Sequence, residues 1–165
     1  MRRLIMLGLM GFSLTVSAAT IGYEPNDWAT FSASNACQNC NLSGYPNYSQ
    51  SGHQNADLQG ANLSHTSFIA NSDYSDSNFS GANFSQADLG NADLSASNLE
   101  NAQFQSASLI GTNFTSTNIT GANFVRANLS NANFLNAHGM TDQQIIVQAL
   151  SVCHAVLPSG AIGAC

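Results

Sequence analysis

Four cysteines offer most of the chemistry in this sequence: Cys37 and Cys40 form a CxxC pair, and Cys153 and Cys165 lie close to the other end of the chain. Thiols with these spacings can form disulfides, act as a redox dithiol or supply ligands to zinc. Redox activity needs a helix N-terminus, usually in a βαβ unit, to lower the pKa of the thiol. Disulfides are therefore the favoured interpretation, with the redox dithiol and the zinc site as alternatives.

Other side chains of the types that often take part in catalysis are dispersed along the sequence. The chain has four histidines, at positions that no common motif links: His53, His65, His138 and His154. No Ser/His/Asp arrangement, phosphate-binding loop or paired-carboxylate motif stands out. Asp88 and Asp93 lie five positions apart, where two solvent-facing carboxylates are more often solvated charge than an acid/base pair. We therefore predict no enzyme activity, no catalytic residue, no cofactor and no metal ion.

The position of every one of these groups depends on residues 56–134, where a five-residue phrase recurs, as in ADLQG, ANLSH, ANFSQ and ADLGN. On a helix at about 100° per residue, positions five apart are separated by roughly 140°, so the central Leu or Phe forms no stripe. On a flat strand, a step of five moves the side chain to the opposite face. The chain must turn within each repeat, which predicts a stacked solenoid.

The types of the central residues indicate how many repeats complete one coil. When each central residue is compared with the one three, four or five repeats later, the two agree most often in being aromatic or aliphatic at four repeats. A lag of two also matches, but a coil of two repeats would leave little room for inward side chains. We therefore prefer four sides and about four coils, roughly 20 Å long at ~4.8 Å per coil. This arrangement predicts two aligned core columns: Phe84, Phe104 and Phe124 in one, and Leu89, Leu109 and Leu129 in the other.

The residue before each centre is most often Asn or Asp, as in Asn78 and Asn83. These side chains are expected to point outward and to form hydrogen bonds across coils or to nearby backbone. Between Phe68 and Tyr74 the spacing of centres grows from five to six. This extra residue predicts a bulge at one corner, after which the register resumes.

The segments outside the repeat suggest an export signal and two caps. Residues 1–19 combine Arg2 and Arg3 with an apolar run and small residues, which is typical of a secretory signal peptide cleaved after Ala18 or Ala19. We expect an N-terminal cap and a first irregular coil at 20–55, the repeat solenoid at 56–137 and a C-terminal cap at 138–165. A capping box at Thr141 predicts a helix over about 142–152. The mature protein would be periplasmic or secreted and would have no membrane anchor.

The solenoid also decides how the cysteines pair. A disulfide requires Cα atoms within about 7 Å. Cys37 and Cys40 belong to the N-terminal cap, whereas Cys153 and Cys165 belong to the C-terminal cap, about four coils away. We therefore predict a Cys37–Cys40 bond and a Cys153–Cys165 bond. The same distance argues against a zinc site that combines Cys37 and Cys40 with Cys153 and His154.

The charge balance of the chain is acidic, with nine Asp and Glu residues against three Lys and Arg. Removal of residues 1–19 would leave Arg126 as the only Lys or Arg and a formal charge near −8. Proteins that bind nucleic acid neutralise its phosphates with basic side chains. We therefore predict no direct binding to nucleic acid.

The tandem A(D/N)(L/F)XX phrase over residues 56–137 resembles the pentapeptide-repeat family. The segments CQNCNLSG at 37–44 and CHAVLPSG at 153–160 resemble sequences that bracket such repeats in bacterial members. The resemblance implies an all-β fold, a right-handed quadrilateral parallel β-helix, here with a short C-terminal capping helix. It implies fold far more than activity. The best-characterised members mimic DNA and bind DNA gyrase, which gives resistance to quinolones.

We therefore predict an exported, non-enzymatic structural or protein-interaction module whose protein partner and oligomeric state remain open. The alternative is an acidic, DNA-mimicking protein that binds gyrase or topoisomerase. The acidic balance fits this alternative. The mostly neutral Asn at the outward position and the export signal, which would remove the protein from the cytoplasm, speak against it.

Overall fold

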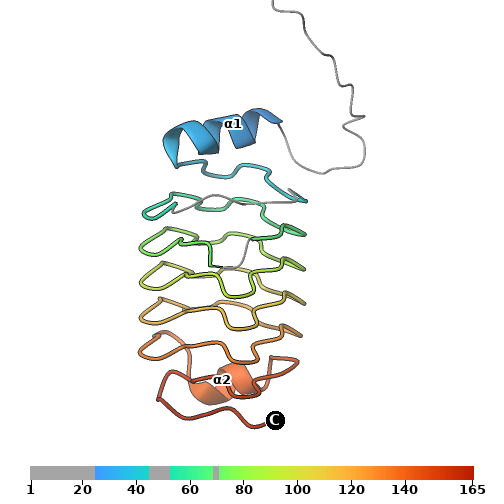
Figure 1. The fold of residues 1–165 in the computed structure, drawn as a ribbon, viewed down its shortest axis with the longest axis vertical. Helices are drawn as coiled ribbons and strands as arrows, with labels where there is room; N and C mark the ends of the chain where they lie inside the picture. The colour runs from blue at the N-terminus through green and yellow to red at the C-terminus, as the bar shows by residue number, and fades with distance from the viewer. Residues whose placement is uncertain (1–24, 45–52, 69–70) are drawn as a thin grey trace, which may run out of the picture.

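The computed structural model describes residues 25–44, 53–68 and 71–165 as a stack of coils with a helix at each end (Figure 1). Helix α1 (Pro25–Ser34) lies across the N-terminal end of the stack, and helix α2 (Asp142–Ile146) lies at the C-terminal end. The predicted signal peptide falls outside the described residues.

Parallel backbone pairing between successive coils sets the repeat of the stack. Asp73 pairs with Asp93, and Asp93 pairs with Asn113, so each regular coil consists of four pentapeptides. The pairs Asn62 with Asn83 and Ser67 with Asp88 are each one residue further apart than this regular spacing. One extra residue therefore lies between Ser67 and Asp73, as the spacing of the centres predicts. The predicted corner itself includes positions 69–70, which lie outside the described residues.

The β-structure of the described residues consists of isolated bridges, and no longer strand occurs among them. This differs from the regular sheets that an all-β fold suggests. The reason is local, because each side of the coil is a single pentapeptide and includes a turn. At Leu58, for example, the N–H of Ala61 donates to the Leu58 carbonyl at 3.0 Å, and Gly60 between them has φ +66°. Only the residue before each centre is left in position to form a bridge.

These turns require positive φ at the second residue after each centre. Glycine adopts this conformation at little cost, and Gly81 has φ +68°. Ala96 and Arg126 hold the same conformation at φ +55° and +60°, where a Cβ atom makes the backbone less favourable by about 1–2 kcal/mol. The repeat geometry thus imposes a backbone conformation that many of its residues do not prefer.

The inside of the coils is packed by the central residues and by the small residues two positions before them. Every residue of the two predicted columns is fully buried: Phe84, Phe104, Phe124, Leu89, Leu109 and Leu129. The Phe104 ring stacks between Phe84 and Phe124, with centroid distances of 5.0 and 5.1 Å and interplanar angles of 3° and 2°. Coils of four pentapeptides therefore place like side chains directly above one another.

Buried Ser and Thr side chains donate hydrogen bonds from their hydroxyl groups to backbone carbonyls of the same coil or of the preceding one. Thr112 Oγ1 donates to the Leu89 carbonyl at 2.8 Å, and Thr117 Oγ1 donates to the Phe114 carbonyl at 2.7 Å. Buried polar groups stabilise a fold only when they are hydrogen-bonded. These bonds explain why polar residues are accepted at positions where other repeats have Ala.

Outside the coils, the Asn and Asp side chains form ladders. Asn118 Nδ2 donates to Asn98 Oδ1 of the preceding coil at 3.2 Å. The same Oδ1 also accepts the backbone N–H of Glu100 at 3.2 Å. Each of these ladder residues therefore joins neighbouring coils and closes its own turn, in the two ways that the sequence pattern predicts.

At the N-terminal end, α1 covers the core. Phe31 of α1 is fully buried, and Trp28 packs against the core at its edge. The sequence pattern suggested a cap here but did not predict a helix.

Helix α2 is shorter than the predicted helix over 142–152. It begins with the predicted capping box, since Thr141 N–H donates to Gln144 Oε1 at 2.8 Å and Gln144 N–H donates to Thr141 Oγ1 at 3.3 Å. It ends at Ile146, because the chain must then return to the stack, where Ser151 pairs with Asn128. The spacing between these two partners exceeds that of a regular coil, so the last coil accommodates α2 by being longer than four pentapeptides.

Candidate functional site

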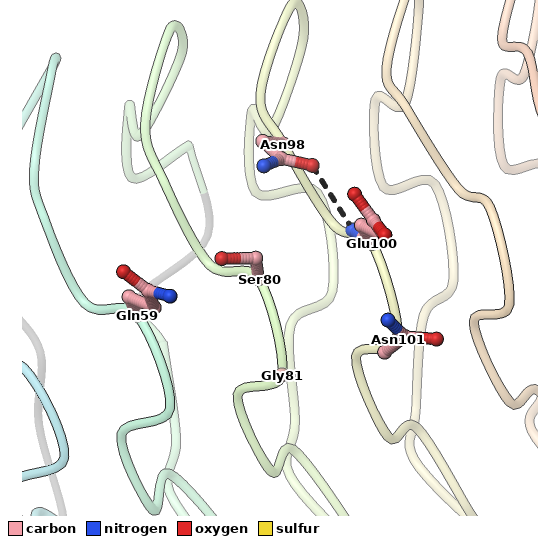
Figure 2. Close-up of a pocket in the computed structure, with 6 residues that line it drawn as sticks. All are labelled: Gln59, Ser80, Gly81, Asn98, Glu100 and Asn101. Carbon is pink, nitrogen blue, oxygen red and sulfur yellow. Dashed lines mark hydrogen bonds between the residues drawn. The ribbon is translucent and has the colours of Figure 1, made fainter.

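A polar groove of about 310 Å³ runs across one side of the stack (Figure 2). Six residues line it: Gln59, Ser80, Gly81, Asn98, Glu100 and Asn101. They come from three successive coils, because Asn78 pairs with Asp57 above it and with Asn98 below it. Gly81, in the middle coil, contributes no side chain.

The side chains that line the groove carry amide, hydroxyl and carboxylate groups. Ser80 Oγ donates to Asn78 Oδ1 at 2.9 Å, and Asn98 belongs to the ladder described above. The side chains of Gln59, Glu100 and Asn101 form no hydrogen bond with another residue in the described part of the chain. Two amides and one carboxylate are therefore available to bind a partner. The residues that line the groove do not place a nucleophile in contact with a base.

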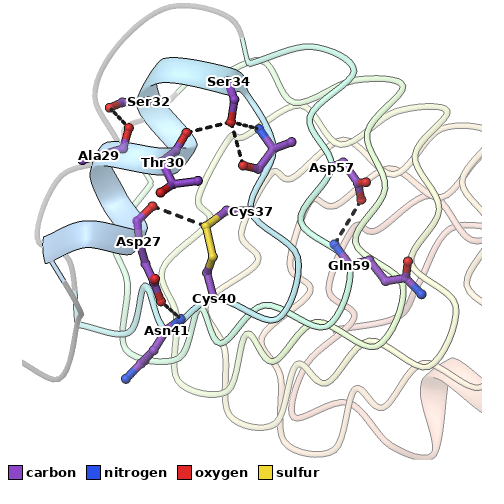
Figure 3. Close-up of a disulfide and its surroundings, with 11 residues drawn as sticks. Asp27, Ala29, Thr30, Ser32, Ser34, Cys37, Cys40, Asn41, Asp57 and Gln59 are labelled. Atoms are coloured by element: carbon purple, nitrogen blue, oxygen red, sulfur yellow. Dashed lines mark hydrogen bonds between the residues drawn. A yellow bond between two sulfur atoms is a disulfide. The ribbon is translucent and has the colours of Figure 1, made fainter.

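The Cys37–Cys40 disulfide lies beneath α1 (Figure 3). Its Cα atoms are 5.5 Å apart. Asp27 of α1 adjoins it on two sides: the Asp27 backbone carbonyl is 3.3 Å from Cys37 Sγ, and Asp27 Oδ2 accepts the N–H of Asn41 at 2.7 Å. Asp27 thus links the helix to the first coil next to the disulfide.

The Cys153–Cys165 disulfide closes the C-terminal cap, with Cα atoms 4.2 Å apart. Val156 and Ile162 pair in antiparallel fashion, so the tail folds back against the last coil. The structure thus brings together the predicted pairs within each cap, and it places no cysteine of one cap beside a cysteine of the other.

An aromatic cluster under α1 contains two titratable side chains. The His53 ring packs against Phe31 at 4.6 Å and against Tyr74 at 5.5 Å between centroids, and His53 Nδ1 lies 2.7 Å from Asn35 Oδ1. Burial lowers the pKa of His53. Burial likewise raises the pKa of the Tyr74 hydroxyl, which has no hydrogen-bond partner among the described residues.

The four histidines do not converge on a site. His53 lies under α1, whereas His65 and His138 belong to different coils and His154 lies in the C-terminal cap. Asp88 and Asp93 lie on separate sides, because they pair with Ser108 and Asn113 respectively. The groove was missed by sequence analysis, although the Gly at position 81 and the polar residues beside the centres are visible in the repeat.

Coils of four pentapeptides, positive-φ turns and Asn ladders together define a solenoid built from five-residue units. A family model described as pentapeptide repeats matches residues 69–101, 77–115 and 97–136. The chain belongs to the pentapeptide-repeat family and has the pentapeptide-repeat fold.

Solved structures that are similar to this chain come from several sources. HetL, a pentapeptide repeat protein involved in heterocyst differentiation regulation from the cyanobacterium Nostoc sp. strain PCC 7120, is 26% identical, with a TM-score of 0.62; the match covers 73% of this chain and 50% of HetL. The chain thus spans half the length of HetL. A thylakoid-lumen protein from Arabidopsis thaliana is 23% identical over 76% of this chain and 82% of its own, with a TM-score of 0.41.

The plasmid-mediated fluoroquinolone resistance protein QnrB1 is 20% identical, over 62% of this chain and 49% of its own, with a TM-score of 0.47. No curated protein sequence matched the chain. Of the described residues, no helix combines the length and apolarity that a bilayer crossing requires.

Proposed function

We propose that this protein is an exported, non-enzymatic structural or interaction module that contacts a protein partner through its outer surface. The observation that carries this proposal is how the coil uses its residues. Side chains at inward positions are packed in the core, and most side chains at outward ladder positions form hydrogen bonds between coils. The groups left for recognition are the side chains beside the ladders, and the groove gathers three of them: Gln59, Glu100 and Asn101.

The finer architecture of this module is the right-handed quadrilateral β-helix that the family resemblance implies. The spacing of the bridges, with four pentapeptides between partners, supports four sides of one pentapeptide each. A rigid support of this kind suits recognition, because a partner then meets groups whose relative positions are fixed before binding.

Export is supported by the composition of residues 1–19 and by two disulfides, which persist in oxidising compartments. N-terminal sequencing of the protein from its native host tests this directly. We expect the mature chain to begin at Ala19 or Thr20. A chain that begins at Met1 and is recovered from the cytoplasm would contradict export.

The partner is tested by affinity capture from periplasmic extract and culture medium. Three baits are compared: wild type, Glu100→Lys, which reverses the charge in the groove, and Asp88→Lys, a matched charge reversal on another side of the stack. We expect a stoichiometric protein that wild type and Asp88→Lys retain and Glu100→Lys loses. Equal capture by all three would move the contact away from the groove, and the absence of any partner would favour a purely structural role.

The alternative function, a DNA mimic that binds gyrase, is favoured by the acidic charge of the chain. In the structure, however, the acidic ladder residues are divided among three sides: Asp57 is on one, Asp88 on a second, and Asp73 and Asp93 on a third. A DNA supercoiling assay separates the two functions. The interaction-module proposal predicts neither gyrase inhibition nor protection from quinolones at micromolar protein.

A further inference from the structure

Three metal-binding side chains meet in the C-terminal cap. The sulfur atoms of Cys153 and Cys165 and a ring nitrogen of His154 all lie within 4.8 Å of one another. His154 and Cys165 are exposed, and Cys153 is half-buried. Two thiolates and an imidazole are a typical zinc ligand set, and a fourth position would be open to water. This set differs from the zinc alternative that the sequence suggested, because it combines Cys153 and His154 with Cys165 and includes neither N-terminal cysteine.

We propose that, after reduction of the Cys153–Cys165 disulfide, Cys153, His154 and Cys165 bind one zinc ion. The reductant is a dithiol: it transfers two electrons and two protons to the disulfide, which becomes two thiols, while the dithiol becomes a disulfide. Binding of Zn²⁺ then displaces the two thiol protons, and the ion forms two Zn–S bonds and one Zn–N bond. The metal would thus replace the disulfide as the link between the tail and the last coil.

Backbone hydrogen bonds hold the three ligands together independently of the S–S bond. The His154 N–H donates to the Gly163 carbonyl at 3.0 Å, and the Gly163 N–H donates to the Ala155 carbonyl at 2.8 Å. Gly163 lies so close to Val152 that a Cβ atom at this position would overlap the Val152 carbonyl oxygen. The segment that carries Cys165 is therefore fixed against the segment that carries Cys153 and His154. Reduction is expected to leave the ligands within reach of one ion.

The N-terminal cap contains a second group, Asp27, Cys37 and Cys40, but it is less available to a metal. Cys37 is only 4% exposed. The Asp27 carboxylate already accepts the N–H of Asn41 at 2.7 Å. Zinc binding there would require the ion to replace a contact that anchors α1, so we assign the site to the C-terminal cap.

The test uses purified protein that carries Cys37→Ser and Cys40→Ser, so that all remaining thiols belong to the C-terminal cap. The protein is reduced with a dithiol, the reductant is removed under argon, and Co²⁺ is titrated while thiolate-to-cobalt absorption bands are recorded. Zn²⁺ is then used to displace Co²⁺. An oxidised sample of the same protein is the control. We expect one metal per reduced chain, displacement by zinc and no binding to the oxidised chain.

The role of His154 is tested by His154→Asn in the same background, because Asn tolerates the positive φ of +58° at this position. Loss of one of three ligands should weaken zinc binding by at least ~10-fold. Far-UV circular dichroism checks that the variant is folded. A second measurement needs no variant at His154: the imidazole ¹⁵N resonances of His154 should shift when one equivalent of Zn²⁺ is added. Absence of metal binding to the reduced chain, unchanged affinity of a folded His154→Asn protein, or an unchanged His154 resonance would each overturn the proposal.

Discussion

Replacement of Phe104 by Ala tests the packing of the solenoid most sharply. Phe104 is fully buried, and its ring stacks on Phe84 and Phe124 and meets Phe114 edge-on at 6.0 Å. Truncation of a buried Phe to Ala usually costs about 3–5 kcal/mol. Each lost aromatic pair adds about 0.5–1.5 kcal/mol beyond burial. Because Phe104 loses a ring contact both above and below, we expect a cost near the upper end of the range of about 3–5 kcal/mol.

The free energy of unfolding is measured by urea denaturation of wild type, Phe104→Ala and the neighbouring control Gln103→Ala. Two probes are followed, because solenoids can unfold in parts: circular dichroism of the whole chain and the fluorescence of Trp28, the single tryptophan. Gln103 is outward-facing; its Nε2 donates to the nearby Asn101 carbonyl at 2.8 Å, and its Oε1 accepts from Gln105 Nε2 at 2.9 Å. Both bonds are local and near solvent, so its replacement should change stability by no more than about 0.5 kcal/mol. A loss below about 1 kcal/mol for Phe104→Ala, or a larger loss for Gln103→Ala, would refute the assignment of inward and outward faces.

The remaining predictions concern the turns, the caps and the aromatic cluster. Tyr74→Phe should stabilise the protein by about 1 kcal/mol in thermal unfolding, because it removes a buried hydroxyl without a partner; destabilisation would mean that the hydroxyl is bonded. Ala96→Gly should raise stability by about 0.5–1 kcal/mol, since Ala96 has φ +55°, and a clear loss would contradict the turn geometry. Replacement of Cys153 and Cys165 by Ser should cost about 2–3 kcal/mol of stability, more than the same change at Cys37 and Cys40. The reason is that the Cys153–Cys165 bond closes a loop with a sequence separation of 12, whereas the Cys37–Cys40 separation is 3. Equal denaturation midpoints of the two variants would contradict this order. In the folded protein the pKa of His53 is lower than its ordinary value of 6.5, so the unfolded chain binds more protons. Stability should therefore fall as the pH drops from 6.5 through the lowered pKa. Trp28 fluorescence should report this loss, and His53→Asn, but not His65→Asn, should flatten the pH dependence of stability.

The five-residue phrase was sufficient to predict the solenoid, because a period of five fits neither a straight helix nor a flat strand. The type match at four repeats predicted the Phe column, and the structure indeed stacks Phe84, Phe104 and Phe124. The pattern could not define the ends, where the repeat is lost. Helix α1 has no clear apolar periodicity, so only its contacts with the first coil reveal it as a cap. The length of α2 was overestimated, because the return of Ser151 to Asn128 is a tertiary constraint.

The groove was beyond sequence analysis for a different reason. Its residues are far apart in the sequence, from Gln59 to Asn101, and only the stacking of coils brings them together. Likewise, the proximity of Cys165 to His154 depends on the antiparallel return of the tail, which no local motif encodes. The groups that these proposals use are therefore brought together by the tertiary structure, and no single sequence motif contains all of them.

The central claim is that one coil consists of four pentapeptides and that side chains four repeats apart are stacked. Nuclear Overhauser contacts among selectively labelled Phe rings measure this directly. The four-repeat coil predicts strong ring contacts from Phe104 to both Phe84 and Phe124, at centroid distances of 5.0 and 5.1 Å. A two-repeat coil would instead stack Phe104 directly on Leu94 and Phe114. The absence of contacts from Phe104 to Phe84 and Phe124 would contradict the fold and, with it, the surface on which the proposed function depends.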